Sequence, residues 1–210
     1  QLSHQYRQDE TAVQLIAVSK TFPSVDIRTL YQQGQRHFGE NYIQEWSQKT
    51  DELADLDIIW HIIGQVQSHK SRTVAEKAAW VHTIDREKIA KRLSEQRPVD
   101  CLPLNVCIEV NTSGNADKHG VNAENVLALA RQVSAMPQLR LRGLMCVPSH
   151  PEDAKKLEQE FALMQQLFKA LQADGLNVDT LSMGMSADME QAIASGATLV
   201  RIGTAIFGHR

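Results

Sequence analysis

Residues 15–23 read Leu15-Ile-Ala-Val-Ser-Lys20-Thr-Phe-Pro23, an apolar run that ends on a lysine and is closed by a proline. Four hydrophobic residues followed by a serine and a lysine are typical of a buried parallel strand whose carboxyl end delivers one amine. Ser24 is a natural N-cap for a helix over residues 25–33, and Gly34 is suited to end that helix. The stretch therefore predicts a strand that passes directly into a helix.

The same alternation of an apolar run and a helical segment repeats along the chain. Further strands are expected at residues 37–41, 58–64, 80–84, 104–110, 139–147, 180–186 and 199–208. Asn41 and Asp85 are expected to cap the helices that follow the second and the fourth strand. The clearest helical pattern has apolar residues at spacings of three and four, at Ala154, Leu157, Phe161, Met164, Phe168 and Leu171.

Eight buried strands that alternate with helices predict an α/β fold with a parallel sheet and right-handed crossovers. Eight such repeats close into a (β/α)8 TIM barrel, so we expect a single domain over residues 1–210. Residues 1–10 are expected to be the tail of a helix that begins before Gln1. The alternative is a doubly wound open sheet, which would normally show a G-x-G-x-x-G turn where this chain has Ser19-Lys-Thr-Phe-Pro23.

The composition argues against several classes of protein. The net charge is -3 over 210 residues and the signs are interspersed, which disfavours a nucleic-acid surface or a membrane-surface helix. No apolar run approaches the length of a membrane span, and no signal peptide is visible. The three cysteines lack C-x-x-C spacing and the eight histidines lack an H-E-x-x-H pair, so no metal site is expected. We therefore expect a cytoplasmic protein with reduced cysteines.

Lys20 is the first candidate for chemistry. In eight-stranded α/β barrels the functional site lies at the carboxyl ends of the strands, where Lys20 is expected. An amine that is partly shielded from water loses part of its preference for the ammonium form and can attack an aldehyde. The alternative is a lysine that merely caps the strand and points to solvent.

A phosphate-binding group is the second part of the predicted site. The loops after the seventh and eighth strands of such barrels often bind phosphate, and here they carry Ser186, Gly203 and Thr204. Ser186 is expected at the amino end of a short helix, where free N–H groups accept an anion. The alternative is an ordinary N-cap, since Asp188 and Glu190 would repel an anion. Together with the strand-end lysine, these residues indicate a phosphorylated aldehyde: pyridoxal phosphate, or a sugar phosphate as in a Schiff-base aldolase.

Seven motifs in fixed order resemble one family from end to end. They are LIAVSKT (15–21), FGENYIQE (38–45), WHIIGQVQSHKS (60–71), HTIDR (82–86), RLRGLMCVP (140–148), LSMGMSADMEQAI (181–193) and VRIGTAIFG (200–208). Over residues 14–210 the chain resembles the pyridoxal-phosphate homeostasis proteins, known in bacteria as YggS-like proteins, which share a barrel with the N-terminal domain of alanine racemase. The resemblance implies that pyridoxal phosphate (PLP) is carried as an aldimine of Lys20, with its phosphate on Ser186, Gly203 and Thr204.

The resemblance also assigns the surroundings of the ring. Arg201 would face the pyridine nitrogen, Asn41 and Met183 would border the ring, and His61 would lie nearby. Because an arginine stays protonated, it donates to the pyridine nitrogen without helping to keep that nitrogen protonated, which restrains carbanion chemistry. The alternative role for Arg201 is a structural ion pair across the barrel mouth.

Two loops depart from the family's pattern. The family loop reads close to I-G-P-L-Q-x-N-K, whereas this chain has Gln65 and His69 within residues 63–70. Lys118 is followed by His119, where a smaller polar residue is common. Both loops are expected over the mouth, so the departures concern rim contacts and ligand exchange rather than cofactor binding.

Racemisation would need an acid–base group on each face of the cofactor, and Lys20 could serve one face. In alanine racemase a tyrosine from a second domain of the partner subunit serves the other face, and no such domain is expected after the eighth strand here. Tyr42 and Cys146 are the remaining candidates. We therefore expect a monomeric, cytoplasmic carrier and buffer of PLP that serves vitamin B6 homeostasis and has apo-forms of PLP-dependent enzymes as recipients. A low-activity amino-acid racemase and a Schiff-base aldolase are the alternatives.

Overall fold

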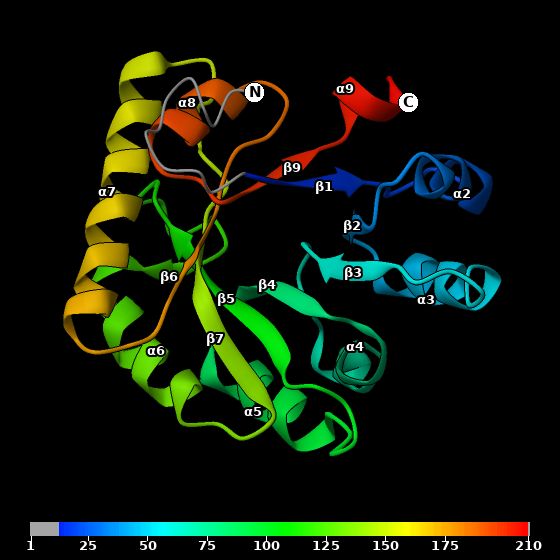
Figure 1. The fold of residues 1–210 in the computed structure, drawn as a ribbon. Helices are drawn as coiled ribbons and strands as arrows, with labels where there is room; N and C mark the ends of the chain where they lie inside the picture. The colour runs from blue at the N-terminus through cyan, green and yellow to red at the C-terminus, as the bar shows by residue number, and fades with distance from the viewer. Residues whose placement is uncertain (1–12, 210) are drawn as a thin grey trace.

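The computed structural model describes residues 13–209, in which eight parallel strands close into a barrel. The strands are β1 (Gln14–Val18), β2 (His37–Glu40), β3 (Ile59–Ile62), β4 (Trp80–Ile84), β5 (Leu104–Asn111), β7 (Leu139–Met145), β8 (Thr180–Ser182) and β9 (Leu199–Ile202). The last strand pairs with the first, with Gln14 opposite Leu199, and Figure 1 shows the resulting ring. The (β/α)8 prediction is confirmed and the open-sheet alternative is wrong. The expected helix at residues 1–10 lies outside the described residues.

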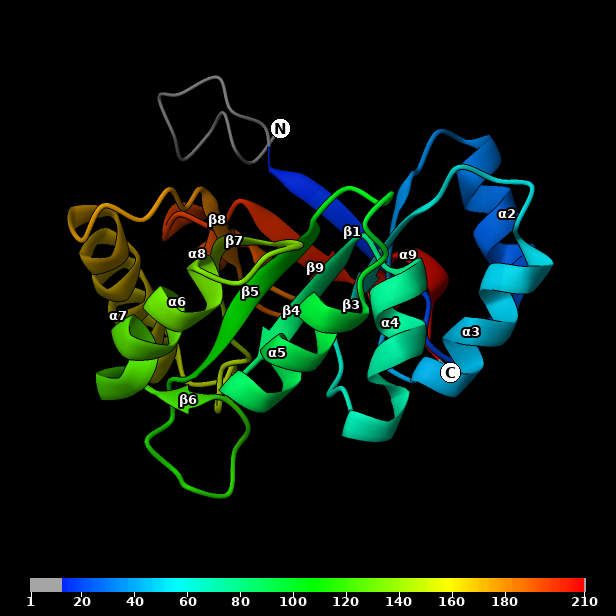
Figure 2. The same cartoon turned by 90° about the horizontal axis from the view of Figure 1, so that it is seen from below.

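Helices lie on the outside of the strands, as Figures 1 and 2 show. They are α2 (Ser24–Gln32), α3 (Ile43–Glu52), α4 (Ser71–Lys77), α5 (Glu87–Gln96), α6 (Val126–Ser134), α7 (Ala154–Ala173), α8 (Met189–Ala194) and α9 (Thr204–Phe207). Short 3-10 turns at Ser68–Lys70 and Ala123–Asn125 precede α4 and α6, and a two-residue strand, β6 (Val121–Asn122), pairs with β5. Of these three short elements, the strand β6 was not predicted from the sequence.

The helix boundaries correct three expected caps. Ser24 is the first residue of α2 rather than its N-cap, which is Pro23. The N-cap of α3 is Tyr42 and not Asn41, and that of α5 is Arg86 and not Asp85. The longest helix, α7, has a side-chain N-cap. The carboxylate of Asp153 accepts hydrogen bonds from two backbone N–H groups of the first turn.

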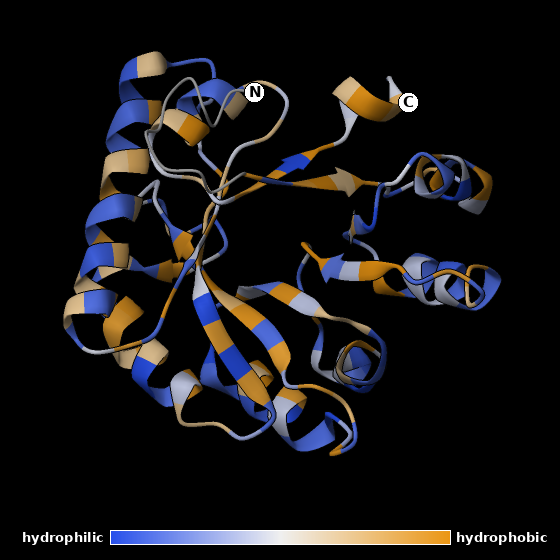
Figure 3. Cartoon of the chain, viewed as in Figure 1, coloured by the Kyte–Doolittle hydropathy of each residue, from blue (hydrophilic) through white to orange (hydrophobic). Residues whose placement is uncertain are grey.

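Buried apolar side chains fill two regions. One lies between strands and helices and includes Phe38, Trp46 and Phe161, all with no exposed area. The other lies inside the ring and contains Ile16, Trp80, Cys107, Met145 and Leu199. Because side chains alternate between the two faces of a strand, both regions draw on the same strands. In Figure 3 hydrophobic and hydrophilic residues alternate along part of β7. Among residues 13–209 no helix is both long and apolar enough to cross a membrane.

Candidate functional site at the carboxyl ends of the strands

A cavity of about 540 Å³ opens at the carboxyl ends of the strands. Six of the seven predicted site residues line it: Lys20, Asn41, Ser186, Arg201, Gly203 and Thr204. The remaining lining residues are Val18, Ile63, Met145, Val147, Met185 and Ala187. The volume suits a small organic ligand, and the walls are mainly apolar between a few polar groups. The structure therefore brings together residues that lie as far apart in the sequence as β1 and β9.

Met183 is the predicted site residue that the structure does not bring to the cavity. It has no exposed area and packs in the core between strands and helices. Its neighbour Ser182 ends β8 and contacts Arg201 inside the barrel, so the alternation of side chains turns Met183 outward. Met185, two residues further on, lines the cavity instead.

Lys20 leaves β1 through a strained turn. Thr21 has φ 66°, a left-handed conformation that is rare for a β-branched residue and costs on the order of 1–3 kcal/mol. The turn is held by two hydrogen bonds: the Thr21 N–H donates to Glu45 Oε1 over 2.6 Å, and the Phe22 N–H donates to the Ser19 carbonyl over 3.0 Å. The direction in which the lysine leaves the strand is therefore determined by its surroundings.

A buried ion pair beneath this turn was missed by the sequence reasoning. Lys49 Nζ lies 2.8 Å from Glu40 Oε1 and 2.8 Å from Glu45 Oε1, and it donates to the Ser19 carbonyl over 2.9 Å. Glu40 has no exposed area, and its second oxygen accepts a hydrogen bond from Ser19 Oγ at 2.5 Å. Burial raises the pKa of Glu40, against the opposing effect of Lys49. This cluster ties β1, β2 and α3 together under the lysine turn.

Asn41 offers an acceptor that nothing in the described residues uses. Its Oδ1 atom is buried and has no hydrogen-bond partner within residues 13–209. The residue is pressed against Gly64, where a Cβ atom would lie only 2.3 Å from the Asn41 carbonyl oxygen. A larger residue at position 64 would therefore push Asn41 out of place. A buried unsatisfied acceptor costs about 1–3 kcal/mol, so its retention at a cavity indicates a ligand contact.

The predicted phosphate residues lie together, but Ser186 is not a helix cap. α8 starts three residues later with Asp188 as its N-cap, and Asp188 Oδ1 accepts a hydrogen bond from the Met185 N–H over 2.7 Å. Burial raises the pKa of Asp188, against the opposing effect of its hydrogen bond from the Met185 N–H. Gly203 is the N-cap of α9, and Thr204 is the first residue of that helix. Two hydroxyl groups and a glycine backbone thus border the cavity.

Arg201 is 3% exposed and is held by neutral groups. Its Nη1 donates to Ser182 Oγ over 2.6 Å, and its Nη2 donates to the Cys146 carbonyl over 2.8 Å. No ion pair involves Arg201 within the described residues, so the structural ion pair considered above is not formed. Burial lowers the pKa of the guanidinium, although arginine remains a cation at any ordinary pH.

His61 does not line the cavity and is linked to Arg201 through His82 and Ser182. His37, His61, His82 and Ser182 form a row of hydrogen bonds in the barrel interior that ends on Arg201. The pKa values of His61 and His82 lie well below the ordinary range, chiefly because both are buried. Neighbouring rings in the row are tilted by 42° and 56° to one another. Within residues 13–209 no three His, Cys, Asp or Glu side chains could hold a metal ion.

The two candidates for a second acid–base group also lie away from the cavity. Tyr42 is 53% exposed at the start of α3, and Cys146 is fully buried with a pKa raised to about 12 by burial. Neither side chain lines the cavity. Cys146 contributes its backbone carbonyl to Arg201, which a sequence motif does not reveal.

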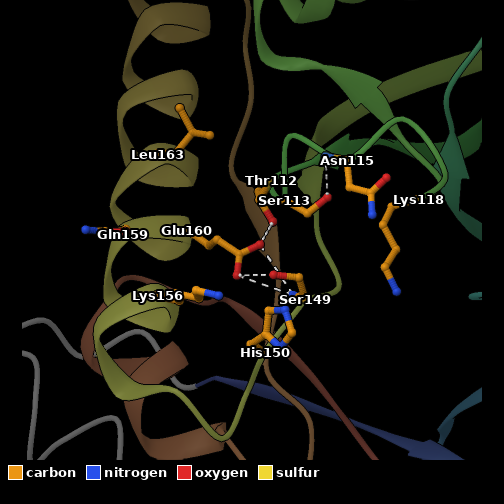
Figure 4. A pocket seen from close by; sticks show the side chains of 10 residues that line it. All are labelled: Thr112, Ser113, Asn115, Lys118, Ser149, His150, Lys156, Gln159, Glu160 and Leu163. Atoms are coloured by element: carbon orange, nitrogen blue, oxygen red, sulfur yellow. Dashed lines mark hydrogen bonds between the residues drawn. The ribbon is translucent and has the colours of Figure 1, made fainter.

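A second cavity, of about 420 Å³, lies between the segment after β5 and α7, and Figure 4 shows its lining. Buried Glu160 accepts from Thr112 Oγ1 at 2.7 Å and from Ser149 Oγ at 3.1 Å. Lys118 lines this second cavity and not the first.

Both departures in the loop at residues 63–70 lie away from the lining of the first cavity. Gln65 Nε2 donates to Glu109 Oε1 at 2.7 Å, which is a contact to the end of β5. His69 is exposed on the 3-10 turn Ser68–Lys70. The departures therefore leave the lining residues of the first cavity unchanged.

Comparison with known proteins agrees with this barrel. The chain matches the family described as alanine racemase, N-terminal domain, over residues 2–210. Alanine racemase from Corynebacterium glutamicum superposes with a TM-score of 0.78 at 15% identity, over 100% of this chain and 61% of that chain. This likeness shows the fold, a barrel of the alanine racemase N-terminal type.

Closer relatives define the family more narrowly. The chain is 52% identical over 202 residues to the pyridoxal phosphate homeostasis protein of Pseudomonas aeruginosa, covering 96% of this chain and 86% of that protein. It is 47% identical to the Escherichia coli K12 protein of the same name, covering 94% and 86%. PipY from Synechococcus elongatus, solved with PLP bound, has a TM-score of 0.86 at 36% identity and covers 99% and 100%. The chain belongs to the family of pyridoxal phosphate homeostasis proteins.

Proposed function

We propose that this protein binds pyridoxal phosphate in the cavity at the carboxyl ends of its strands and carries and buffers it for vitamin B6 homeostasis. One observation carries the proposal: an amine, two hydroxyl groups, a glycine and a buried cation line a single cavity, on Lys20, Ser186, Thr204, Gly203 and Arg201. The family membership and the PLP-bound PipY structure support it.

The lining residues fit the chemistry of this cofactor. Lys20 supplies the amine that attaches to the aldehyde, and Ser186 and Thr204 donate hydroxyl hydrogen bonds to the phosphate. Arg201 donates to the ring nitrogen while its other contacts remain on Ser182 and Cys146.

The remaining polar and apolar groups suit an aromatic ring. The unused Oδ1 of Asn41 is available to a donor at the ring edge or to a water. Val18, Ile63, Met145 and Val147 provide apolar walls, which suit a flat aromatic ring better than a polyhydroxylated sugar chain. This observation favours PLP over the sugar phosphate of an aldolase.

Carrying suits the site better than racemisation. Bound PLP supplies an electron sink for carbanions next to its aldehyde carbon. Arg201 weakens that sink because it donates a hydrogen bond without protonating the ring nitrogen. Among the residues that line the cavity, Lys20 is the one side chain suited to take up a proton. Exchange of protons on both faces is therefore not supported by the lining residues, and we expect alanine and serine to be racemised at a negligible rate.

The visible absorption spectrum tests the proposal. Purified protein should be yellow, and borohydride should fix the cofactor on Lys20, as located by peptide mapping. Lys20→Ala should abolish the fixed adduct, whereas Lys118→Ala, at the second cavity, should retain it. An adduct on Lys70 or Lys118, or a colourless protein that binds no added PLP, contradicts the proposal.

Delivery, oligomeric state and location are further parts of the proposal. We infer a monomer in the cytoplasm that hands PLP to apo-forms of PLP-dependent enzymes. The exposed large apolar side chains of the described residues belong to four separate segments of the chain rather than to one helix or strand: Val25, Tyr42, Val99 with Leu102, and Val147. Light scattering on a sizing column tests the monomer, and cell fractionation tests the location. Reactivation of an apo-transaminase no faster than free release of PLP would contradict direct delivery.

A further inference from the structure

The barrel interior contains an uninterrupted row of hydrogen bonds that ends on Arg201. His37 Nδ1 and His61 Nε2 are 2.9 Å apart, and His61 Nδ1 and His82 Nε2 are 2.9 Å apart. His82 Nδ1 lies 2.7 Å from Ser182 Oγ, which accepts from Arg201 Nη1 at 2.6 Å. His61 and His82 each use Nδ1 on one side and Nε2 on the other, so the rings are linked head to tail.

The row runs through the barrel interior from the amino ends of the strands towards the cavity at their carboxyl ends. His37 starts β2 at the amino ends of the strands, and the registers place Gly39 beside His61 and His61 beside Trp80. His82 therefore stands two residues higher on β4, which Figure 1 shows beside β3. Trp80 stacks on His61 with ring centroids 5.3 Å apart, which holds the middle ring in place.

The available donor protons favour one direction of donation along the row, from Arg201 and Ser182 towards His37. Arg201 only donates, so Ser182 Oγ accepts there and keeps its own proton to donate to His82 Nδ1. A neutral imidazole has one donor and one acceptor nitrogen. His82 must then carry its proton on Nε2 and donate to His61, which likewise donates to His37.

The opposite direction leaves a polar group unsatisfied. If His82 donated from Nδ1, Ser182 Oγ would receive two donors and its own proton would lack an acceptor among its contacts in the described residues. Ser182 has no exposed area, so water would not compensate, and an unmade buried hydrogen bond is costly. A protonated His61 or His82 would carry an N–H on both ring nitrogens, and one of these would face another donor in the row.

We propose that His82, supported by His61 and His37, is a positioning residue for Arg201: the neutral row holds Ser182 as the fixed acceptor of Nη1 and so aims the guanidinium at the ring nitrogen of the bound cofactor. The inference rests on the proposed function for its ligand, but the direction of the row belongs to the protein alone. It makes the cavity selective for a ring that presents a nitrogen acceptor.

Two substitutions of His82 separate positioning from packing. The amide of His82→Asn lies near the position of Nδ1 and can still bond Ser182, whereas the amide of His82→Gln lies near Nε2 and keeps only the contact with His61. His69→Gln, on the exposed turn before α4, is the control.

The first measurement is the affinity for PLP and for its 1-deaza analogue, in which C–H replaces the ring nitrogen. His82→Gln should weaken PLP binding about tenfold, the effect of losing one hydrogen bond of roughly 1.4 kcal/mol, and leave the deaza analogue unchanged. His82→Asn should recover most of the difference. Equal weakening of both ligands, or none, overturns the positioning role.

The second measurement needs neither a ligand nor a variant. Nitrogen-15 NMR of histidine-labelled, unsubstituted protein without PLP should show His61 and His82 neutral at pH 7 with the proton on Nε2. A proton on Nδ1 of either ring, or an imidazolium, overturns the row even if the His82 variants fail to fold. If PLP does not bind the unsubstituted protein while the expected tautomers are found, the proposed function fails and the row stands.

Discussion

The cavity and the barrel interior directly beneath it differ in whether their buried polar atoms have hydrogen-bond partners. In the interior, His61, His82 and Ser182 are each hydrogen-bonded on two sides. At the mouth, Asn41 Oδ1 has no partner within residues 13–209, and the other two such buried atoms in that range, Trp46 Nε1 and Asp188 Oδ2, belong to residues that do not line the cavity. Buried polar atoms without partners reduce stability, so they persist where a ligand uses them. The comparison suggests that substitutions in the interior change the free energy of unfolding, whereas substitutions at the mouth change binding.

The strongest test of this division is the buried pair under the lysine turn. Lys49→Met should lower the free energy of unfolding by about 3–5 kcal/mol, because it leaves the fully buried Glu40 carboxylate without its cation. Lys77→Met is the matched control: its pair with Asp51 is exposed and should change stability by less than about 1 kcal/mol. Urea denaturation measures both, and equal effects would contradict the division.

The phosphate residues should show the reverse pattern. Ser186→Ala combined with Thr204→Val should weaken PLP binding, because each hydrogen bond to a charged group contributes about 1.5–3 kcal/mol. The free energy of unfolding without ligand should change by no more than about 0.5 kcal/mol per site. The matched control is Ser113→Ala with Thr112→Val at the second cavity, which should leave affinity unchanged. Unaltered affinity in the first pair would remove these residues from the phosphate site.

The histidine row makes stability depend on pH. Burial lowers the pKa of His61 and His82 in the folded protein, so below about pH 6.5 the unfolded chain binds more protons than the folded one. Their stabilising contribution is complete above that pH and is lost as the pH falls towards the lowered pKa values. The free energy of unfolding should fall on acidification by up to about 1.4 kcal/mol per pH unit for each histidine.

Three carboxyl groups modify this pH dependence at its acid end. Burial raises the pKa of Glu40, Glu109 and Asp188, so above their ordinary values, near 4.5 for the glutamates and 3.8 for Asp188, they contribute the opposite slope. The histidine effect is therefore taken as the difference between the unsubstituted protein and His61→Gln, measured by denaturation between pH 5 and 7. An identical slope in the two proteins would show that His61 is not the cause.

The smallest expected effect concerns Asn41. Asn41→Leu removes an unsatisfied acceptor, so the ligand-free protein should be unchanged or more stable by up to about 1 kcal/mol, while PLP binds less tightly. Asn105→Leu is the matched control, because Asn105 bonds both Ala79 and Arg142 and its loss should destabilise. A marked loss of stability in Asn41→Leu would show that this residue belongs to the scaffold.

Much of the candidate site could be predicted from the sequence because its residues directly follow the carboxyl ends of strands. A lysine after the first strand and Gly203-Thr204 after the last are brought together by barrel closure alone, whatever the details of packing. Met183 is the predicted residue that does not line the cavity, because the prediction used the motif and ignored the alternation of side chains along β8. Ser182 inward and Met183 outward could have been read from period-two alternation.

The interior could not have been predicted in the same way. Lys49 and Glu40 are on different elements, and their contact depends on how α3 packs against β2. The three histidines occupy three neighbouring strands, but their hydrogen bonds depend on the strand registers, which a single sequence does not show. Side-chain networks of this kind follow from packing and not from local pattern.

Closure of the eight-stranded ring also limits how another protein can approach this one. Every barrel strand has a partner on both sides, and within residues 13–209 the open strand edge that remains is the two-residue β6. Pairing of a foreign strand, a common mode of protein association, therefore has almost no template here. In the delivery proposed above, a recipient protein would have to recognise the loops and helix ends around the mouth, where Val147 lines the cavity and exposes apolar surface. Recognition by side chains rather than backbone ties the choice of recipient to a few rim positions, which can change without altering the barrel.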